Sequence, residues 1–281
     1  KMLRYYETRT LSKAGLKYHP KYPSKIIETA MKYSGYKDGK NLDFLLDVSC
    51  GAGQATKLFS PYFKTVLGVD PSLPQLETAK ENCYFDNVTF KEGVAEDLPV
   101  AKESVDMVVA GAATHWFNVE AFFKETERVL KPGGTLVVLD YDSPKFLPVG
   151  LHSKANAEKL ELDEAEKFVR LDLIPNYNRS RFCIIDRTRY RDIFEAMPFN
   201  DKHRIDSFTS KHLWTLEDAM GFLKSMDVYE HLKKSSDNEV SRPTTDVKKK
   251  EADFVEDFEC LNSDVFMVAT FQYFVLIANK P

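Results

Sequence analysis

Short apolar runs alternate with amphipathic segments from residue 44 to residue 139, and this pattern constrains the fold more than any other feature of the chain. Continuous apolar runs of this length are typical of strands that are covered on both faces, as in a parallel sheet. The expected strands are 44–48, 65–69, 88–90, 105–110 and 135–139, and the expected helices are a segment through Leu58 and Phe59, 73–82 and 118–130. Such alternation predicts an α/β fold with a Rossmann-like, doubly wound sheet.

The segments on either side of this pattern suggest a four-part organisation. Further helices are expected at 23–34, 152–172, 186–197, 215–233 and 246–261, a loop at 235–245, and strands at 204–210 and 271–277. We therefore predict a lid segment and first helix (1–40), a Rossmann-like core (41–145), a helical substrate cap that includes one core strand near 204–210 (146–262), and a last core strand (263–281).

Composition excludes several classes of protein. Hydrophobic residues make up 43% of the 281 residues and charged residues 29%, so the chain can bury a core and is not wholly disordered. No stretch approaches the roughly 18 uninterrupted apolar residues of a membrane helix. The four cysteines are far apart and form no C-x-x-C pair, which predicts thiols in a reducing cytoplasm and no metal site.

Charge is unevenly distributed along the chain. Residues 1–40 hold ten Lys and Arg against three Asp and Glu, whereas residues 41–145 hold nine against sixteen. A basic segment with interleaved tyrosines could grip nucleic acid. No nucleic-acid motif accompanies it, so we expect no nucleic-acid partner and interpret residues 1–22 as a lid. Arginines 179, 181, 187, 189 and 191 are expected on a solvated face, or else one or two of them clamp an acceptor carboxylate.

A glycine-containing turn follows the first expected strand, in the segment from Asp47 to Gly53. A glycine turn between a strand and a helix lets a ligand approach the backbone, although a purely structural turn has the same residues. An acidic residue there favours a cationic or hydroxyl-bearing ligand over a pyrophosphate. Asp70 ends the second strand, where a carboxylate can accept both ribose hydroxyls of an adenosine or instead cap the next helix. Ala95 and Glu96 follow the third strand and could contact an adenine.

Five motifs together resemble the class I S-adenosylmethionine-dependent methyltransferases, and more narrowly the trans-aconitate methyltransferase-like (methyltransferase type 11) small-molecule group. They are Asp47-Val-Ser-Cys-Gly-Ala-Gly-Gln54, Gly68-Val-Asp-Pro-Ser72, Gly93-Val-Ala-Glu-Asp-Leu-Pro99, Ala113-Thr-His-Trp-Phe117 and Arg128-Val-Leu-Lys-Pro-Gly-Gly134. The resemblance implies a mostly parallel sheet with a final antiparallel strand, S-adenosyl-L-methionine as cofactor, and a small-molecule acceptor bound by a monomer or homodimer. The cofactor-binding residues that it implies are Tyr22, Asp47, Ser49, Cys50, Gly51, Gly53, Asp70, Pro71, Leu76, Ala95, Glu96, Ala112 and His115.

The resemblance also places His115 and Trp116 near the reacting centre as candidate catalytic residues, where His115 would orient the acceptor or accept a proton. A histidine packed beneath the cap is the alternative. Tyr18 and Tyr22 would close over the cofactor or simply pack. Ser49 stands where the family has a glycine, and a Cβ tolerates positive φ poorly.

Three functions therefore remain open at this stage. The first is methylation of a small molecule, with an acid that gives a methyl ester favoured over O- or N-methylation of another metabolite. The second is cofactor binding without turnover, which the serine at position 49 motivates. The third is methylation of RNA or protein.

Overall fold

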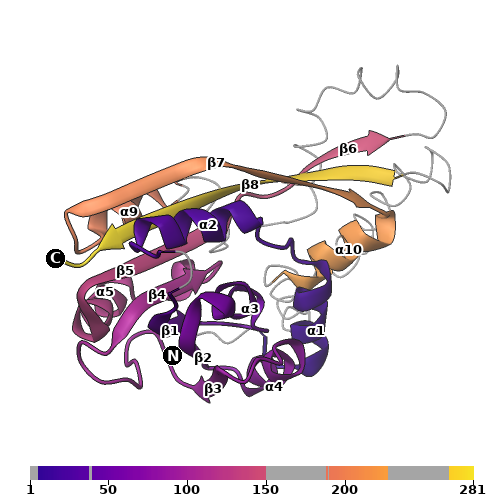
Figure 1. Cartoon of the computed structure of the whole chain (residues 1–281). Coiled ribbons are helices and arrows are strands. Elements are labelled where there is room, and N and C mark those ends of the chain that lie inside the picture. Colours follow the sequence, from indigo (N-terminus) through magenta and orange to yellow (C-terminus); the bar gives the residue numbers. More distant parts are fainter. Residues whose placement is uncertain (1–5, 38–39, 150–187, 189, 227–265) are drawn as a thin grey trace, which may run out of the picture.

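The computed structural model describes residues 6–37, 40–149, 188, 190–226 and 266–281. Within these residues, eight strands form one sheet in the order β3-β2-β1-β4-β5-β8-β6, and β7 pairs with the other edge of β8 (Figure 1). The strands are β1 (Leu42–Val48), β2 (Phe63–Asp70), β3 (Val88–Glu92), β4 (Val105–Gly111), β5 (Leu130–Tyr141), β6 (Lys145–Val149), β7 (Asp201–Trp214) and β8 (Phe266–Asn279). The described helices are α1 (Arg9–Tyr18), α2 (Ser24–Tyr33), α3 (Gln54–Phe59), α4 (Leu73–Asn82), α5 (Val119–Val129), α9 (Arg191–Ala196), α10 (Leu216–Ser225) and the 3₁₀ turns η1 (Ser60–Tyr62) and η2 (Thr114–Trp116).

The predicted α/β architecture is confirmed. Strands β1 to β5 are mutually parallel, and β8 is antiparallel to β5. The strand expected at 204–210 is β7, which is longer than predicted because it pairs along most of β8. The helices predicted at 152–172 and 246–261 and the loop at 235–245 lie outside the described residues. The division into four parts stays a prediction.

The elements β5, α1 and β6 also differ from the sequence expectation. β5 begins at Leu130 rather than Thr135, because Leu130 already pairs with Val105 of β4. The backbone of Gly133 and Gly134 then bonds to Lys280, with N–H···O distances of 2.9 Å in both directions. The other two elements, α1 and β6, were not expected from the sequence.

β8 joins β6 and β7 to the rest of the sheet, because it pairs with both of them and with β5. Residues 273–279 of β8 pair with β5, residues 266–270 pair with β6, and the opposite edge pairs with β7. In Figure 1 the yellow β8 therefore runs between β7 and the β5–β6 side. β8 is the last strand in the sequence, yet it lies inside the sheet rather than at its edge.

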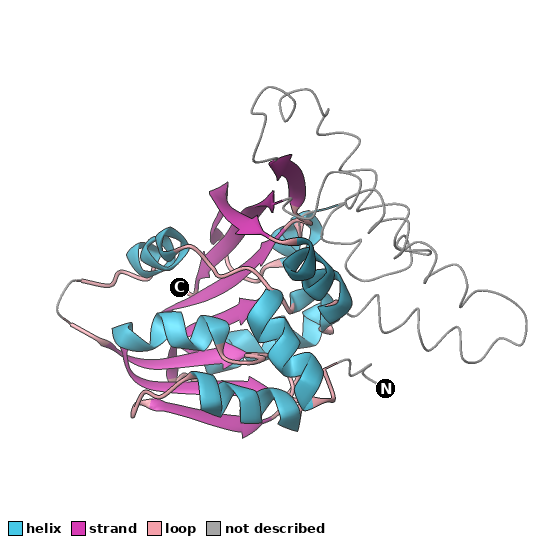
Figure 2. Ribbon diagram, turned by 90° about the vertical axis from the view of Figure 1, so that its right-hand side faces the viewer, coloured by secondary structure: helices cyan, strands magenta, loops and turns pink. Residues whose placement is uncertain are grey.

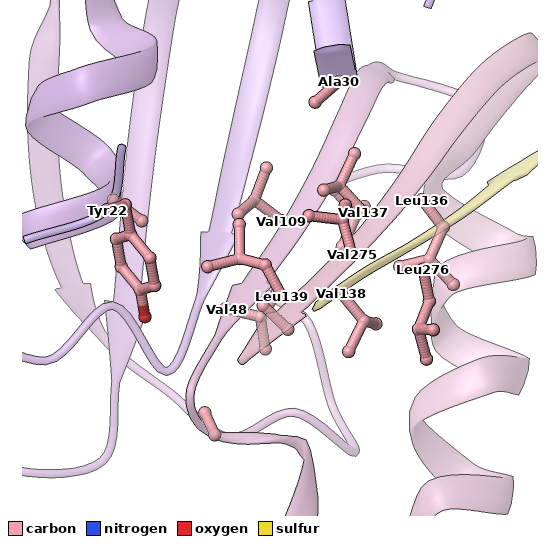
Figure 3. Close-up of a cluster of buried hydrophobic side chains, with 14 of the residues drawn as sticks. Tyr22, Ala30, Val48, Val109, Leu136, Val137, Val138, Leu139, Val275 and Leu276 are labelled. Atoms are coloured by element: carbon pink, nitrogen blue, oxygen red, sulfur yellow. The ribbon is translucent and has the colours of Figure 1, made fainter. Parts of the chain in front are cut away.

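The core lies on both faces of the central strands. The side chains of Val109, Val137 and Val275 are fully buried, and Ala30 of α2 points toward the first two of them (Figure 3). Because side chains alternate along a strand, Leu136 and Val138 face the other side of the sheet. Figure 2 shows the helices packed against the strands, and none of the described helices combines the length and apolar character that a bilayer crossing requires.

Candidate functional site: a cleft at the carboxyl edge of the sheet

A cleft opens where four adjacent parallel strands end. Ligands of open α/β sheets bind at this edge. Each strand contributes a residue to the cleft wall: Asp70 from β2, Asp47 from β1, Gly111 from β4 and Asp140 from β5. The segment from Tyr6 to Tyr22 supplies much of the opposite wall.

The turn between β1 and α3 has three residues in the left-handed region. Ser49 has φ = 56°, Gly51 has φ = 54° and Gly53 has φ = 81°. A residue with a Cβ gives up roughly 1–2 kcal/mol in this conformation, so the serine is strained but accommodated. The turn's amides are used internally: those of Cys50, Gly51 and Gly53 donate to Val69 O, Asp70 Oδ2 and Cys50 O at 2.9–3.0 Å. These amides therefore do not form a cradle for a pyrophosphate, which would need them unpaired.

Asp70 is buried, and each of its two carboxylate oxygens accepts a hydrogen bond from a backbone amide. Its Oδ2 accepts the Gly51 amide at 3.0 Å and its Oδ1 accepts the Ser72 amide at 2.8 Å. The N-cap of α4 is Ser72, so Asp70 does not have the capping role that the sequence left open. Burial raises the pKa of Asp70 to about 6, and hydrogen bonds from Ser72, Gly51 and Ser49 oppose that shift. The hydroxyl of Ser49 thus stabilises the carboxylate beside it.

Asp47 is a buried carboxylate near the carboxyl end of β1. Its Oδ2 accepts the hydroxyl of Thr56 at 2.5 Å, whereas its Oδ1 is buried and has no hydrogen-bond partner within the described residues. Burial raises the pKa of Asp47 to about 7, and the Thr56 hydrogen bond opposes the shift. A cationic ligand group at this oxygen would satisfy it and favour the ionised carboxylate.

The β4–β5 end of the cleft holds His115, Trp116, Asp140 and Tyr141. Nδ1 of His115 lies 3.5 Å from Oδ2 of Asp140, and the same nitrogen forms a short contact with the hydroxyl of Tyr190. That hydroxyl also accepts the His115 amide at 3.1 Å. Burial and the nearby charge of Asp140 raise the pKa of Tyr190 well above its usual value, so its hydroxyl keeps its proton. The imidazole, carboxyl and phenol form one buried polar cluster.

Helix α1 closes the cleft from the side of α4 and α10, and α1 and α10 lie side by side in Figure 1. The hydroxyl of Ser12 donates to Gln75 Oε1 at 2.7 Å, and the hydroxyl of Ser72 donates to the Tyr6 carbonyl at 2.6 Å. After the helix, Nδ1 of His19 lies 2.8 Å from the Tyr141 hydroxyl. Burial lowers the pKa of His19 to about 4, so the ring is neutral near pH 7.

The structure brings most of the sequence-predicted site residues into this cleft. The residues that line it are Tyr22, Asp47, Ser49, Cys50, Gly51, Asp70, Pro71, Ala112, His115 and Trp116. The predicted residues that do not line it are Gly53, Leu76, Ala95 and Glu96, and their contact with the cofactor stays a prediction. Glu96 instead accepts the Asn118 amide at 2.8 Å. Of the five arginines, only Arg191 is described, and it is exposed on α9.

Sequence reasoning missed several polar residues of the site, among them His19, Asp140, Tyr141 and Tyr190. Asp140 had a usable signal, because it ends the fifth strand and strand ends of a parallel sheet meet at one edge. No pattern in the sequence indicates that Tyr190, fifty residues away, contacts it.

Comparisons with known proteins agree with this geometry. The model of the methyltransferase domain family (Methyltransf_11) matches residues 46–138. A probable S-adenosylmethionine-dependent methyltransferase of Saccharomyces cerevisiae is 28% identical over 226 residues, which is 75% of this chain and 76% of that protein. A methyltransferase relative from Dictyostelium discoideum is 32% identical over 49% of each chain. A solved structure from Anaeromyxobacter dehalogenans, described as a "Putative Type II Methyltransferase", has a TM-score of 0.61 at 20% identity and covers 93% of this chain and 97% of its own, a likeness of fold.

The residues of the cleft fit S-adenosylmethionine, the methyl donor of this family. It carries a ribose diol and an ammonium group but no phosphate. The carboxylate of Asp70 suits the diol, and the unsatisfied, buried Oδ1 of Asp47 suits the ammonium. The chain is therefore an S-adenosylmethionine-dependent methyltransferase, with a type 11 methyltransferase domain at residues 46–138 and the class I fold.

Proposed function

We propose that this methyltransferase acts on a small molecule that binds at the β4–β5 end of the cleft. The observation that carries the proposal is the order of the acidic residues along the sheet edge. Asp70, Asp47 and Asp140 end β2, β1 and β5, and three interstrand spacings, about 14 Å in all, separate the first strand from the last. The adenosine would lie at the β2 end and the acceptor beyond β4, with the methionine portion between them.

Each residue then has a separate task. Asp70 would accept the ribose hydroxyls, and Asp47 would pair with the ammonium group. When bound, S-adenosylmethionine supplies an electrophilic methyl group on a sulfonium. Trp116 and His115 would form the wall against which the acceptor is aligned. Alignment and exclusion of water are the main contributions that a protein makes to such a transfer.

The N-terminal segment supports a closed cleft rather than a nucleic-acid groove. Arg9 and Lys13 pair with Glu81 of α4, and Lys17 lies 3.7 Å from Glu217 of α10. These basic side chains therefore connect α1 to its neighbouring helices. We propose that residues 1–22 act as a lid over the donor and acceptor, which disfavours RNA methylation.

Cofactor binding without turnover is the other candidate that the sequence raised, on the basis of Ser49. The serine adopts φ = 56°, and its hydroxyl hydrogen-bonds the Asp70 carboxylate. This arrangement supports a competent turn, so we favour catalysis.

Isotope transfer tests the proposal. The protein is incubated with S-adenosylmethionine carrying a labelled methyl group and, in separate reactions, with a deproteinised metabolite extract, total RNA and a protein extract. We expect label only in the metabolite fraction and saturable binding of S-adenosylmethionine in calorimetry. Label in RNA or protein alone would refute the small-molecule acceptor, and binding without any transfer would support the non-catalytic alternative.

A further inference from the structure

The acceptor end of the cleft has a charge pattern that selects the chemistry of the acceptor. Among the described residues that line the cleft there is no Lys or Arg, whereas Asp47, Asp70 and Asp140 all contribute to it. A carboxylate acceptor would have to enter beside the buried Asp140 without a cationic partner from these residues. Bringing two like charges together in a buried site is unfavourable. The described lining therefore disfavours an acid that is converted to a methyl ester.

Asp140 is a buried carboxylate that joins the contact between His115 and Tyr190. Its side chain is 1% exposed, its Oδ1 accepts the Tyr141 amide at 2.8 Å, and a hydrogen bond from the Tyr190 hydroxyl to Asp140 helps to raise the pKa of Tyr190. A buried carboxylate is stabilised by hydrogen bonds and by a nearby group that can carry a positive charge. The closest basic atom is Nδ1 of His115, 3.5 Å away.

The position of Asp140 also determines which nitrogen of His115 carries the proton. A lone pair on Nδ1 would face the carboxylate unfavourably, whereas an N–H there is attracted to it. The Tyr190 hydroxyl contacts the same nitrogen and the His115 amide, so it holds the ring in this orientation. Tyr190 is itself immobilised, because its side chain is fully buried and packs edge-on against Phe274 with ring centroids 5.4 Å apart. With the proton on Nδ1, Nε2 carries the lone pair.

We propose that Asp140, His115 and Tyr190 form a proton-accepting unit, and that the acceptor reacts through a hydroxyl or amine that still carries a proton. This inference rests on the proposed function and specifies the acceptor class of the same site. The acceptor's O–H or N–H proton passes to Nε2 of His115, and the lone pair left on oxygen or nitrogen forms the bond to the methyl carbon. The carbon–sulfur bond breaks with its electron pair remaining on sulfur, which becomes a neutral thioether. Asp140 stabilises the imidazolium, and Tyr190 is a positioning residue.

The stability of the product toward base tests the acceptor class without knowledge of the acceptor. The deproteinised extract is labelled as above, the labelled products are treated with alkali, and volatile label is measured. Methyl esters release labelled methanol under these conditions, whereas methyl ethers and methylamines do not. We expect the label to stay in the non-volatile fraction. Volatile label would overturn the inference but leave small-molecule methylation intact, and no labelled product at all would overturn the proposed function itself.

Substitutions test the three residues. Asp140→Asn should lower kcat by about a hundred-fold or more, within the usual range for loss of general-base catalysis, while calorimetry gives an unchanged affinity for S-adenosylmethionine. Asp86→Asn, which makes the same chemical change at an exposed position, serves as the matched control and should leave both unchanged. Tyr190→Phe keeps the ring and should lower kcat about ten-fold, which provides a second test if the asparagine variant does not fold.

A spectroscopic readout separates this role from a purely structural one. The ¹⁵N chemical shifts of the His115 ring report which nitrogen carries the proton, with no substrate present. We expect the Nδ1–H tautomer in the unmodified protein and a mixture of tautomers in Asp140→Asn. An unchanged tautomer in that variant, together with unchanged kcat, would refute the proton-accepting unit.

Discussion

Two glycines inside neighbouring helices predict opposite effects of the same substitution. A glycine within a helix costs about 1 kcal/mol relative to alanine, so Gly→Ala normally stabilises. At Gly221 of α10, however, an added Cβ would lie 2.4 Å from Cε1 and Cζ of Tyr18. At Gly15 of α1 the nearest atom would be Cε1 of Tyr6, at an ordinary 3.7 Å. The difference arises because the Tyr18 ring lies directly on the backbone of α10.

The expected magnitudes follow from these distances. In Gly221→Ala the Tyr18 ring must retreat by about 1 Å, and overpacking of this kind typically costs ~1–3 kcal/mol. After the helix-propensity gain is subtracted, the free energy of unfolding should fall by about 0–2 kcal/mol. Gly15→Ala should raise it by about 1 kcal/mol, so the two variants should differ by roughly 1–3 kcal/mol.

Urea unfolding of the two variants and the unmodified protein measures this difference directly. Methyl transfer should also fall in Gly221→Ala, because α1 is displaced from the wall of the cleft that it forms. Equal stabilisation by both substitutions would refute the packing of Tyr18 on α10, and with it the attachment of α1 through this contact.

Three further predictions concern the donor site and the lid. Asp70→Asn should weaken binding of S-adenosylmethionine by about 1–3 kcal/mol in calorimetry, while NAD should not bind to the unmodified protein; an unchanged affinity would give Asp70 only the role of holding the turn. Burial raises the pKa of Asp47 to about 7 and of Asp70 to about 6, so affinity should fall as the pH is lowered from 8 to 5, because protonation removes the charge that the ammonium needs. The sign is reversed for the protein alone: both pKa values are raised on folding, so these two carboxyls should raise Tm over that same decrease in pH, against the opposing effect of His19, whose pKa is lowered. The rise should be smaller in Asp47→Asn, and an unchanged pH dependence of Tm in that variant would contradict the burial of Asp47. Deletion of residues 1–22 should lower the rate of methyl transfer steeply while Tm changes little, and full activity of that variant would show that the segment is not a lid.

The sequence sufficed for those parts of the fold that have local patterns. The segments 44–48 and 65–69 are mostly apolar, because helices cover the central strands on both faces, and the structure has β1 and β2 there. Helix α1 has no such pattern: its buried residues are Ser12 and Gly15, and it is stabilised by contacts with α4 and α10 rather than by an apolar stripe of its own. Strand β6 contains Pro148, a residue that argues against a strand unless the strand lies at an edge.

The residues of the candidate site likewise fall into those that the sequence could predict and those that it could not. Asp47 and Asp70 could be found because each ends a strand that the sequence reveals. The contact of His115 with Tyr190 joins residues 75 positions apart, and Tyr190 adopts φ = 59°, which few residues other than glycine do. No propensity predicts such a pairing, because it depends on the packed tertiary structure. The contact of His19 with Tyr141 could not be predicted either, because His19 follows α1, a helix that is stabilised by contacts with α4 and α10.

The interior position of β8 has a consequence for how the chain reaches its folded state. β8 pairs with β5 across more than a hundred intervening residues, for example between Thr135 and Asn279. Contacts of such large sequence separation close slowly, because the entropy of a long loop is lost before the contacts form. During synthesis, the edge of β5 that pairs with β8 therefore stays unpaired until β8 has been made. Exposed strand edges can pair with other chains and so promote aggregation. We expect substitutions in β8 that weaken pairing to reduce the yield of folded protein more than its final stability suggests.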